Sequence, residues 1–186
     1  MIKCIAAVDK NFGIGYKNKL LFSIPEDMKF FRETTKDSVV VMGRNTYDSI
    51  GKPLKDRVNI VITSKLDLRN NKEVFSGSLE EMERIINLYS NQDIYIIGGS
   101  SIYNYFIDKC DVVLLTMYNR EYQNVDSYFP DIIKHGFIEN SKIKDGYFED
   151  HYYKITYWTK KLNWWKIKYN CILYFKVNRK IVLEVR

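Results

Sequence analysis

The sequence predicts an α/β fold built on a largely parallel β-sheet. Short runs rich in valine and isoleucine have the length of buried strands, and segments with the apolar spacing of helices separate them. Strands that alternate with helices form sheets whose ligand sites lie at the carboxyl ends of the strands. We expect strands at residues 1–8, 38–42, 58–63, 93–97, 111–118 and 151–161.

Helices are expected between these strands, at residues 25–35, 44–50, 78–90 and 100–109. The first begins with Pro25, whose fixed φ suits the first helical position. Ser78 and Glu81 have the spacing of a capping box, in which each side chain satisfies a free N–H group at the start of the third helix.

Composition favours one globular domain with a basic extension. The chain has 186 residues, of which 46% are hydrophobic, so it can bury one substantial core. The net charge is +6, but residues 162–186 hold six basic side chains against one acidic side chain. We therefore expect a domain at residues 1–161 and a basic, aromatic C-terminal extension at 162–186 of uncertain structure.

Cysteine spacing and hydropathy favour a cytoplasmic protein without a membrane anchor. Cys4, Cys110 and Cys171 are far apart, odd in number and without metal-ligand spacing, so we expect neither a complete set of disulfides nor a metal site. The apolar run at the N-terminus stops at Asp9 and Lys10, which makes it too short for a signal peptide or a membrane span.

Asp27 is the first candidate for chemistry. On a helical wheel it lies at the edge of the apolar stripe, between Phe30 and Phe31, whereas Glu26 points away from the stripe. An acid in the first helical turn complements the helix dipole, which explains Glu26 fully and Asp27 only in part. A carboxylate facing aromatic rings must be paired, protonated or part of a site. Both interpretations stay open at this point.

Two glycine-containing turns suit phosphate. Gly98 and Gly99 stand where a strand gives way to a helix, so a phosphate can approach the backbone and the free N–H groups of the helix. Gly43 has the same position after another strand and is followed by Arg44, a forked donor to phosphate oxygens. Two such turns suggest a dinucleotide, although an ordinary tight turn explains the glycine pair equally well. No complete G-x-G-x-x-G motif is present, which disfavours an ordinary Rossmann domain.

A loop arginine and two histidines complete the candidates. Arg57 directly precedes a predicted strand, after a turn set by Gly51 and Pro53, and could hold a carboxylate in a forked pair; a solvated loop cation is the alternative. His135 and His151 stand alone without a nucleophile motif, so we assign them no catalytic role.

Taken in order, six stretches resemble the dihydrofolate reductases: "IAAVDKNFGIG", "IPEDMKFF", "VVVMGRNTYDSIGKPLKDRVNIVITS", "IYIIGGSSIY", "LLTMYN" and "VDSYFP". The resemblance covers about residues 1–160. It implies a central, mainly parallel eight-stranded sheet with an antiparallel C-terminal edge strand and four flanking helices. It also implies that hydride passes from C4 of NADPH to C6 of 7,8-dihydrofolate, with protonation at N5. The product, 5,6,7,8-tetrahydrofolate, would supply one-carbon and thymidylate metabolism.

The resemblance assigns roles residue by residue. Asp27 would support protonation at N5, and Thr116 would hydrogen-bond to Asp27. The expected substrate contacts are Ile5, Met28, Phe31, Arg32, Ile50, Lys52, Leu54 and Arg57. The expected cofactor contacts are Ala7, Ile14, Gly15, Asn18, Leu20, Gly43, Arg44, Asn45, Thr46, Ser49, Thr63, Ser64, Ile97, Gly98, Gly99, Ser100, Ser101 and Tyr103.

Three details follow from the resemblance. Arg44 is expected to read the 2′-phosphate of NADPH. The peptide bond between Gly98 and Gly99 is expected to be cis. Residues 13–19 with Leu20 are expected to form a mobile loop that closes over the nicotinamide.

The sequence departs from the family pattern at Leu21 and Phe22, where the family usually has proline and tryptophan. Phenylalanine has no N–H group, so the water that the indole normally anchors near the pterin must be held otherwise or lost. The departure bears on proton relay and on the response to antifolate inhibitors, which are expected ligands.

Two other functions fit parts of the sequence. A same-fold relative, the reductase of riboflavin synthesis, acts on a ribosylated pyrimidine, but Asp27 with Phe31 and Arg57 favours a pterin that carries a glutamate. The alternative from another class is a nucleic-acid-binding module at residues 162–186, because aromatic rings stack on bases and cations neutralise phosphates. We expect a monomer that does not bind nucleic acid.

Overall fold

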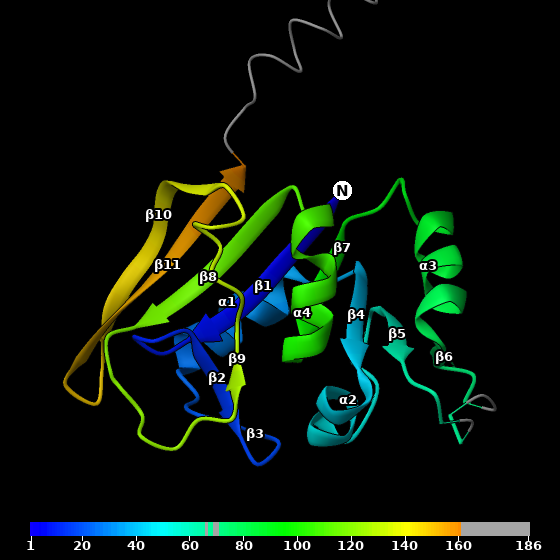
Figure 1. Cartoon of the computed structure of the whole chain (residues 1–186), viewed down its shortest axis with the longest axis horizontal. Coiled ribbons are helices and arrows are strands. Elements are labelled where there is room, and N and C mark those ends of the chain that lie inside the picture. Colours follow the sequence, from blue (N-terminus) through cyan, green and yellow to red (C-terminus); the bar gives the residue numbers. More distant parts are fainter. Residues whose placement is uncertain (66, 69–70, 161–186) are drawn as a thin grey trace, which may run out of the picture.

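A sheet of eight strands forms the centre of the computed structural model, which describes residues 1–65, 67–68 and 71–160 (Figure 1). The expected extension at 162–186 lies outside the described residues. The strand order is β10-β11-β8-β1-β7-β4-β5-β6. The strands span Ile2–Val8 (β1), Val39–Gly43 (β4), Val58–Ile62 (β5), Val74–Gly77 (β6), Ile94–Gly98 (β7), Val112–Tyr118 (β8), Phe137–Phe148 (β10) and His151–Lys160 (β11).

All strands of this sheet except β11 run in one direction. β1 pairs in parallel with β7 and β8, β4 with β5 and β7, and β5 with β6. β11 is antiparallel to both of its neighbours, β8 and β10. The structure confirms a mainly parallel eight-stranded sheet with an antiparallel C-terminal strand. That strand lies one place in from the edge, because β10 pairs along its outer side.

Within the described residues, four α-helices flank the sheet, as the resemblance implies. They span Pro25–Thr34 (α1), Arg44–Ile50 (α2), Leu79–Leu88 (α3) and Ser100–Phe106 (α4), and a short 3-10 helix at Ile107–Lys109 continues α4. In Figure 1, α4 lies in front of the sheet and α1 behind it. None of the described helices has the length and hydrophobicity needed to cross a bilayer.

The sheet divides the core into two layers. Side chains alternate between the faces of a strand, so Val40 of β4 packs in the layer that contains Phe31 of α1. The neighbouring Val41 packs in the other layer, with Met82 of α3 and Phe106 of α4. This burial on both faces is what the continuous valine and isoleucine runs predict.

The sequence patterns do not locate five of the strands. Two of them, β6 and β10, belong to the large sheet. The other three, β2 (Gly13–Tyr16), β3 (Lys19–Leu20) and β9 (Ser127–Tyr128), form a small antiparallel sheet. The expectation of a loop at residues 13–19 is wrong for β2, which pairs with β3 on one side and with β9, more than a hundred residues away, on the other. β10 is mostly exposed and has two register irregularities, so it shows no regular alternation.

The predicted capping box at the start of α3 is present and can be tested. The Ser78 hydroxyl accepts a hydrogen bond from the Glu81 N–H at 3.2 Å, and the Ser78 N–H donates to the Glu81 carboxylate at 2.8 Å. Ser78→Ala removes the first bond and should lower the free energy of unfolding by about 1 kcal/mol. Chemical denaturation measures the change, with Ser90→Ala, at an exposed position beyond the helix, as the control. Equal midpoints for S78A and wild type would contradict a stabilising cap.

Candidate active site

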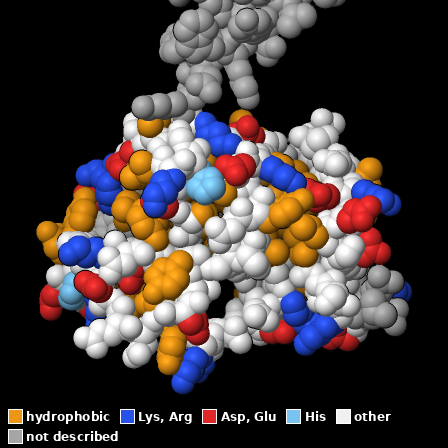
Figure 2. Space-filling model, in the orientation of Figure 1, with side chains coloured by type: hydrophobic (Ala, Val, Ile, Leu, Met, Phe, Trp, Pro, Cys, Tyr) orange, Lys and Arg blue, Asp and Glu red, His pale blue; other side chains and the backbone are white. Residues whose placement is uncertain are grey.

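A cavity of about 780 Å³ opens at the carboxyl ends of the parallel strands. Residues near the ends of β1, β4, β5 and β7 form its floor, and the small sheet, α2 and the start of α4 form its walls. Figure 2 shows the surface hollowed between the small sheet and α2. This is the position at which α/β sheets bind ligands, because the ends of parallel strands meet at one edge.

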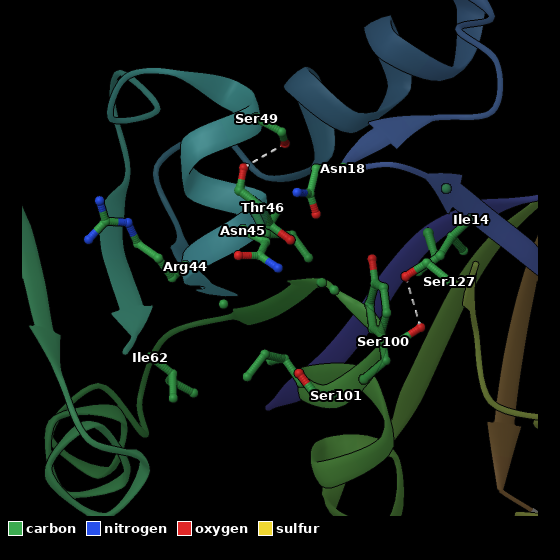
Figure 3. Close-up of a pocket in the computed structure, with 18 of the residues that line it drawn as sticks. Ile14, Asn18, Arg44, Asn45, Thr46, Ser49, Ile62, Ser100, Ser101 and Ser127 are labelled. Carbon is green, nitrogen blue, oxygen red and sulfur yellow. Dashed lines mark hydrogen bonds between the residues drawn. The ribbon is translucent and has the colours of Figure 1, made fainter. Parts of the chain in front are cut away.

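Every residue that the sequence analysis assigns to the cofactor lines this cavity. Figure 3 shows that Arg44 lies at one end of it, and Ile14, Ser100 and Ser127 at the other. Nine further residues line the cavity without an expected cofactor contact: Ala6, Tyr16, Lys19, Ile62, Ser78, Leu79, Ile102, Asp126 and Ser127. Tyr16 and Lys19 among them belong to the loop expected over the nicotinamide. Most of them adjoin an expected residue in the chain. Asp126 and Ser127 reach the cavity only through the pairing of β9 with β2, which no local pattern reveals.

Both phosphate-suited turns border the cavity. Gly43 and Gly99 are the N-cap residues of α2 and α4, and these helices follow the neighbouring strands β4 and β7. The peptide bond between Gly98 and Gly99 is cis, as expected. Gly98 has a φ of +117°, and a Cβ there would lie 3.1 Å from the Tyr103 ring, so only glycine suits the position. Gly43, Gly98 and Gly99 all line the cavity, so a ligand there meets the backbone of both turns, with free helix N–H groups beside it.

The small sheet is tied to the start of α4 through a serine. The Ser100 hydroxyl accepts from the Tyr128 N–H at 2.8 Å and lies 3.2 Å from the Ser127 hydroxyl (Figure 3). It also donates to the Tyr128 carbonyl. These bonds hold one wall of the cavity against the turn that carries the glycine pair.

The expected loop over the nicotinamide is anchored at its start and at its turn. Asp9 is only 1% exposed, and its carboxylate accepts from the N–H groups of Asn11 at 2.8 Å and Gly13 at 2.7 Å. In the turn between β2 and β3, the Lys17 N–H donates to the Asp126 carboxylate at 2.8 Å. The contacts place the loop beside the cavity, and its mobility stays a prediction.

Asp27 of α1 faces Thr116 of β8. The Thr116 hydroxyl donates to Asp27 Oδ1 at 2.5 Å. Burial raises the pKa of the partly exposed Asp27 above its ordinary value, and the bond from Thr116 offsets part of that rise. None of the ion pairs among the described residues involves Asp27. A desolvated acid held by one hydroxyl fits a site better than a helix start.

Asp27 and Thr116 lie one strand away from the cavity. Thr116 on β8 is the register partner of Ala7 on β1, and Ala7 lines the cavity. Adjacent strands are about 4.8 Å apart. The acid is therefore a neighbour of the cavity even though it does not line it.

The expected apolar substrate contacts gather on the same side of the sheet as Asp27. Ile5 belongs to the hydrophobic layer against which Phe31, Ile50 and Leu54 pack. These residues come from β1, α1, α2 and the loop after α2. Among the remaining substrate candidates, Met28 is partly buried, while Arg32 and Lys52 are exposed.

Arg57 is held in place rather than solvated. Its Nε donates to the Thr35 carbonyl at 3.1 Å and its Nη2 to the Arg32 carbonyl at 3.0 Å. The guanidinium lies 5.9 Å from the centre of the Phe31 ring. Burial lowers the pKa of Arg57, but arginine stays charged because its ordinary pKa is above about 12. A fixed cation with unused N–H groups thus stands at the end of the apolar layer, where it can receive a carboxylate.

Phe22 packs among tyrosines beside α1. Its ring centre lies 4.8 Å from that of Tyr118 and 6.0 Å from that of Tyr122. The Tyr118 hydroxyl donates to the Phe148 carbonyl at 2.8 Å, so its proton is directed away from the Phe22 ring. At the position where the resemblance implies tryptophan, this chain thus has an apolar ring packed against a hydrophobic cluster.

Two cysteines that are distant in sequence lie together in the core. Cys4 Sγ and Cys110 Sγ are 3.2 Å apart, both residues are buried and both are free thiols. Burial raises the pKa of the Cys4 thiol. They belong to the layer that contains α3 and α4, away from Asp27. Among the described residues, no group of three or more side chains could bind a metal ion.

The raised pKa of Asp27 predicts a pH-dependent effect of Asp27→Asn on stability. The folded state binds more protons than the unfolded state between the ordinary pKa of about 3.9 and the higher folded value. The acid is therefore neutral and compatible with burial at low pH, and its ionisation lowers stability as the pH rises through the folded pKa. Asparagine keeps the carbonyl that accepts from Thr116 but carries no charge.

We expect D27N to unfold at a higher temperature than wild type near pH 7.5 and to lose this advantage near pH 4, since the acid is then about half neutral even when unfolded. Thermal unfolding across this range measures the difference. Glu26→Gln, at the exposed neighbouring position, controls for the loss of a surface charge. A difference between D27N and wild type that stays constant with pH would show that Asp27 titrates normally.

Comparisons with known proteins agree with this geometry. The family model for dihydrofolate reductase matches residues 1–161. The chain is 34% identical to dihydrofolate reductase from Buchnera aphidicola subsp. Baizongia pistaciae over 155 residues, which cover 79% of this chain and 93% of that protein. It is 33% identical to dihydrofolate reductase from Bacillus subtilis over 131 residues, which cover 70% of this chain and 76% of that protein.

A solved structure is similar over most of the chain. Dihydrofolate reductase from Enterococcus faecalis, complexed with NADP(H) and RAB-propyl, superposes with a TM-score of 0.76 and 29% sequence identity. The match covers 87% of this chain and 96% of that one. The family model, the relatives and the fold lead to one conclusion: the chain belongs to the dihydrofolate reductase family.

Proposed function

We propose that the chain reduces 7,8-dihydrofolate to 5,6,7,8-tetrahydrofolate with NADPH and so supplies one-carbon and thymidylate metabolism. The observation that carries the proposal is the position of the desolvated acid. Asp27 is bonded to Thr116, which is the strand partner of a cavity residue, Ala7. A proton donor therefore lies next to the place where a ring bound against β1 would accept a hydride.

The cavity fits an extended dinucleotide. Its lining extends from Ile14 at one end to Arg44 at the other (Figure 3), and Gly43, Gly98 and Gly99 of the two glycine turns are among the lining residues. We assign the pyrophosphate to the backbone at Gly43 and Gly99, because free helix N–H groups complement anions. Arg44 would bind the 2′-phosphate. When bound, NADPH supplies the hydride, and the residues of the chain position the two rings and exclude water.

Asp27 would hold the pterin and help deliver its proton. One carboxyl oxygen is engaged by Thr116, which leaves the other for the amino group and ring nitrogen of a pterin. Because its pKa is raised, Asp27 remains protonated at a higher pH than an ordinary aspartate would, which suits an acid that supports protonation at N5.

The remaining substrate contacts suit the rest of the folate. The apolar layer of Ile5, Phe31, Ile50 and Leu54 offers walls to flat rings, and antifolate inhibitors would use the same walls. Arg57 would bind the α-carboxylate of the glutamate, and the exposed Arg32 and Lys52 would flank it at the rim, while Met28 lies beside the acid in the chain. Residues 13–19 with Leu20 would close over the nicotinamide.

No observation on the described residues favours the nucleic-acid alternative. That reading depends on residues 162–186, which lie outside them. On the face shown in Figure 2, basic and acidic side chains are interspersed. The monomeric state and the cytoplasmic location stay predictions.

The role of Asp27 is tested by mixing the protein with NADPH and dihydrofolate and following the loss of NADPH absorbance. We expect turnover by wild type and a loss of at least about a hundredfold in D27N near neutral pH, the size of a general acid's contribution. Activity of D27N should partly recover at low pH, where the substrate arrives already protonated. Glu26→Gln should retain the wild-type rate. Equal rates for D27N and wild type at neutral pH would refute the proposed role.

Arg57→Gln tests carboxylate recognition. Loss of a charge-assisted pair should raise KM for dihydrofolate by about ten- to a hundredfold with little change in kcat. A dihydropterin without the glutamate should be turned over equally by R57Q and wild type, because it never meets the guanidinium. Lys55→Gln removes an exposed cation from the same loop and is the control. An equal loss on both substrates would show that Arg57 acts on the fold instead.

A further inference from the structure

Arg44 is bound by two carboxylates of its own chain. Its Nε lies 2.7 Å from Asp48 Oδ1, one helical turn further along α2. Its Nη1 lies 2.6 Å from Asp67 Oδ1, in the segment after β5. The Arg44 side chain is 20% exposed, whereas those of Asp48 and Asp67 are 48% and 55% exposed. The guanidinium is thus held by two anions that themselves reach solvent.

These bonds occupy two of the five N–H groups of the guanidinium. The bond from Arg44 lowers the pKa of Asp67, which keeps this acid ionised at neutral pH, and Lys65 lies near enough to favour the same charge state. Any anion that approaches the tip of the arginine must therefore approach Asp67 as well. The negative charges of the anion and of Asp67 repel each other. Salt screens this repulsion because the site is exposed.

We propose that Asp67 is a specificity-determining residue that competes with the cofactor 2′-phosphate for Arg44 and so limits the preference for NADPH over NADH. The inference rests on the proposed function, which makes Arg44 the reader of that phosphate. Asp67 contacts Nη1, one of the two terminal nitrogens of the guanidinium that a phosphate would also contact. Asp48 contacts Nε, on the stem side, and holds the side chain along α2.

Arg44 differs from an arginine that has no acidic partner before its ligand binds. NADH has no 2′-phosphate, so neither attraction to Arg44 nor repulsion by Asp67 changes its affinity. NADPH must displace the Asp67 carboxylate or bind beside it. The acid thus acts on one cofactor only, which separates its effect from general changes in affinity.

The test compares two fragments of the cofactors that differ only in the phosphate, 2′,5′-ADP and 5′-AMP. Calorimetric titration of the full-length protein gives both dissociation constants. In Asp67→Asn we expect 2′,5′-ADP to bind about two- to fivefold more tightly than in wild type, the upper part of the range for one exposed ion pair, with 5′-AMP unchanged. The ratio of kcat/KM for NADPH to that for NADH should rise by the same factor. The gain should shrink in high salt.

Glu33→Gln is the matched control, because it removes one carboxylate from another exposed pair, that of Lys29 and Glu33 in α1. This variant should leave the ratio of the dissociation constants for 5′-AMP and 2′,5′-ADP unchanged. Arg44→Ala should remove the preference for 2′,5′-ADP. An unchanged 2′,5′-ADP affinity in D67N, an equal change for 5′-AMP, or an unchanged ratio in R44A would each overturn the inference. Failure of the proposed function would give a different result. Wild type would then not oxidise NADPH in the presence of dihydrofolate, whatever the ratio of the dissociation constants for the two fragments.

Discussion

The parallel alignment of β1, β4, β5 and β7 is the constraint on which the site depends. It brings four carboxyl ends to one edge, so that turns far apart in sequence border one cavity. The alignment is stabilised by burial, since valine and isoleucine face a hydrophobic layer on each side of the sheet. A polar site is thus built at the rim of a core whose interior is apolar.

The position of Asp27 follows from the same layering. Its helix packs on the face of the sheet that carries Ile5 and Phe31, and this contact desolvates the carboxyl group. One hydroxyl, that of Thr116, reaches it across the gap from β8. Burial and a single neutral partner leave the acid able to hold a proton, whereas a salt bridge would have kept it ionised. Packing therefore sets the chemistry of this group.

The two arginines near the ligand sites are held in different ways. Arg57 is bonded to main-chain carbonyls, which orient it without neutralising its charge. Arg44 is bonded to carboxylates, which orient it and compete for it. An arginine of the first kind offers its full charge to an incoming carboxylate. For an arginine of the second kind, the net gain is only the difference between its interaction free energy with the ligand and that with the carboxylate already bound.

Local patterns by themselves determined the buried strands, the four helices and the capping box of Ser78, because these depend on residues close together in the chain. The resemblance to the family supplied the cofactor residues, and all of them line one cavity. Only the tertiary structure decided the pairing of β2 with β9, the exposed edge strand β10, the contact of Cys4 with Cys110 and the second carboxylate on Arg44. Each of these joins residues far apart in sequence or lies where exposure erases the apolar pattern. Such contacts are selected only when the whole chain closes around its core, so no local pattern encodes them.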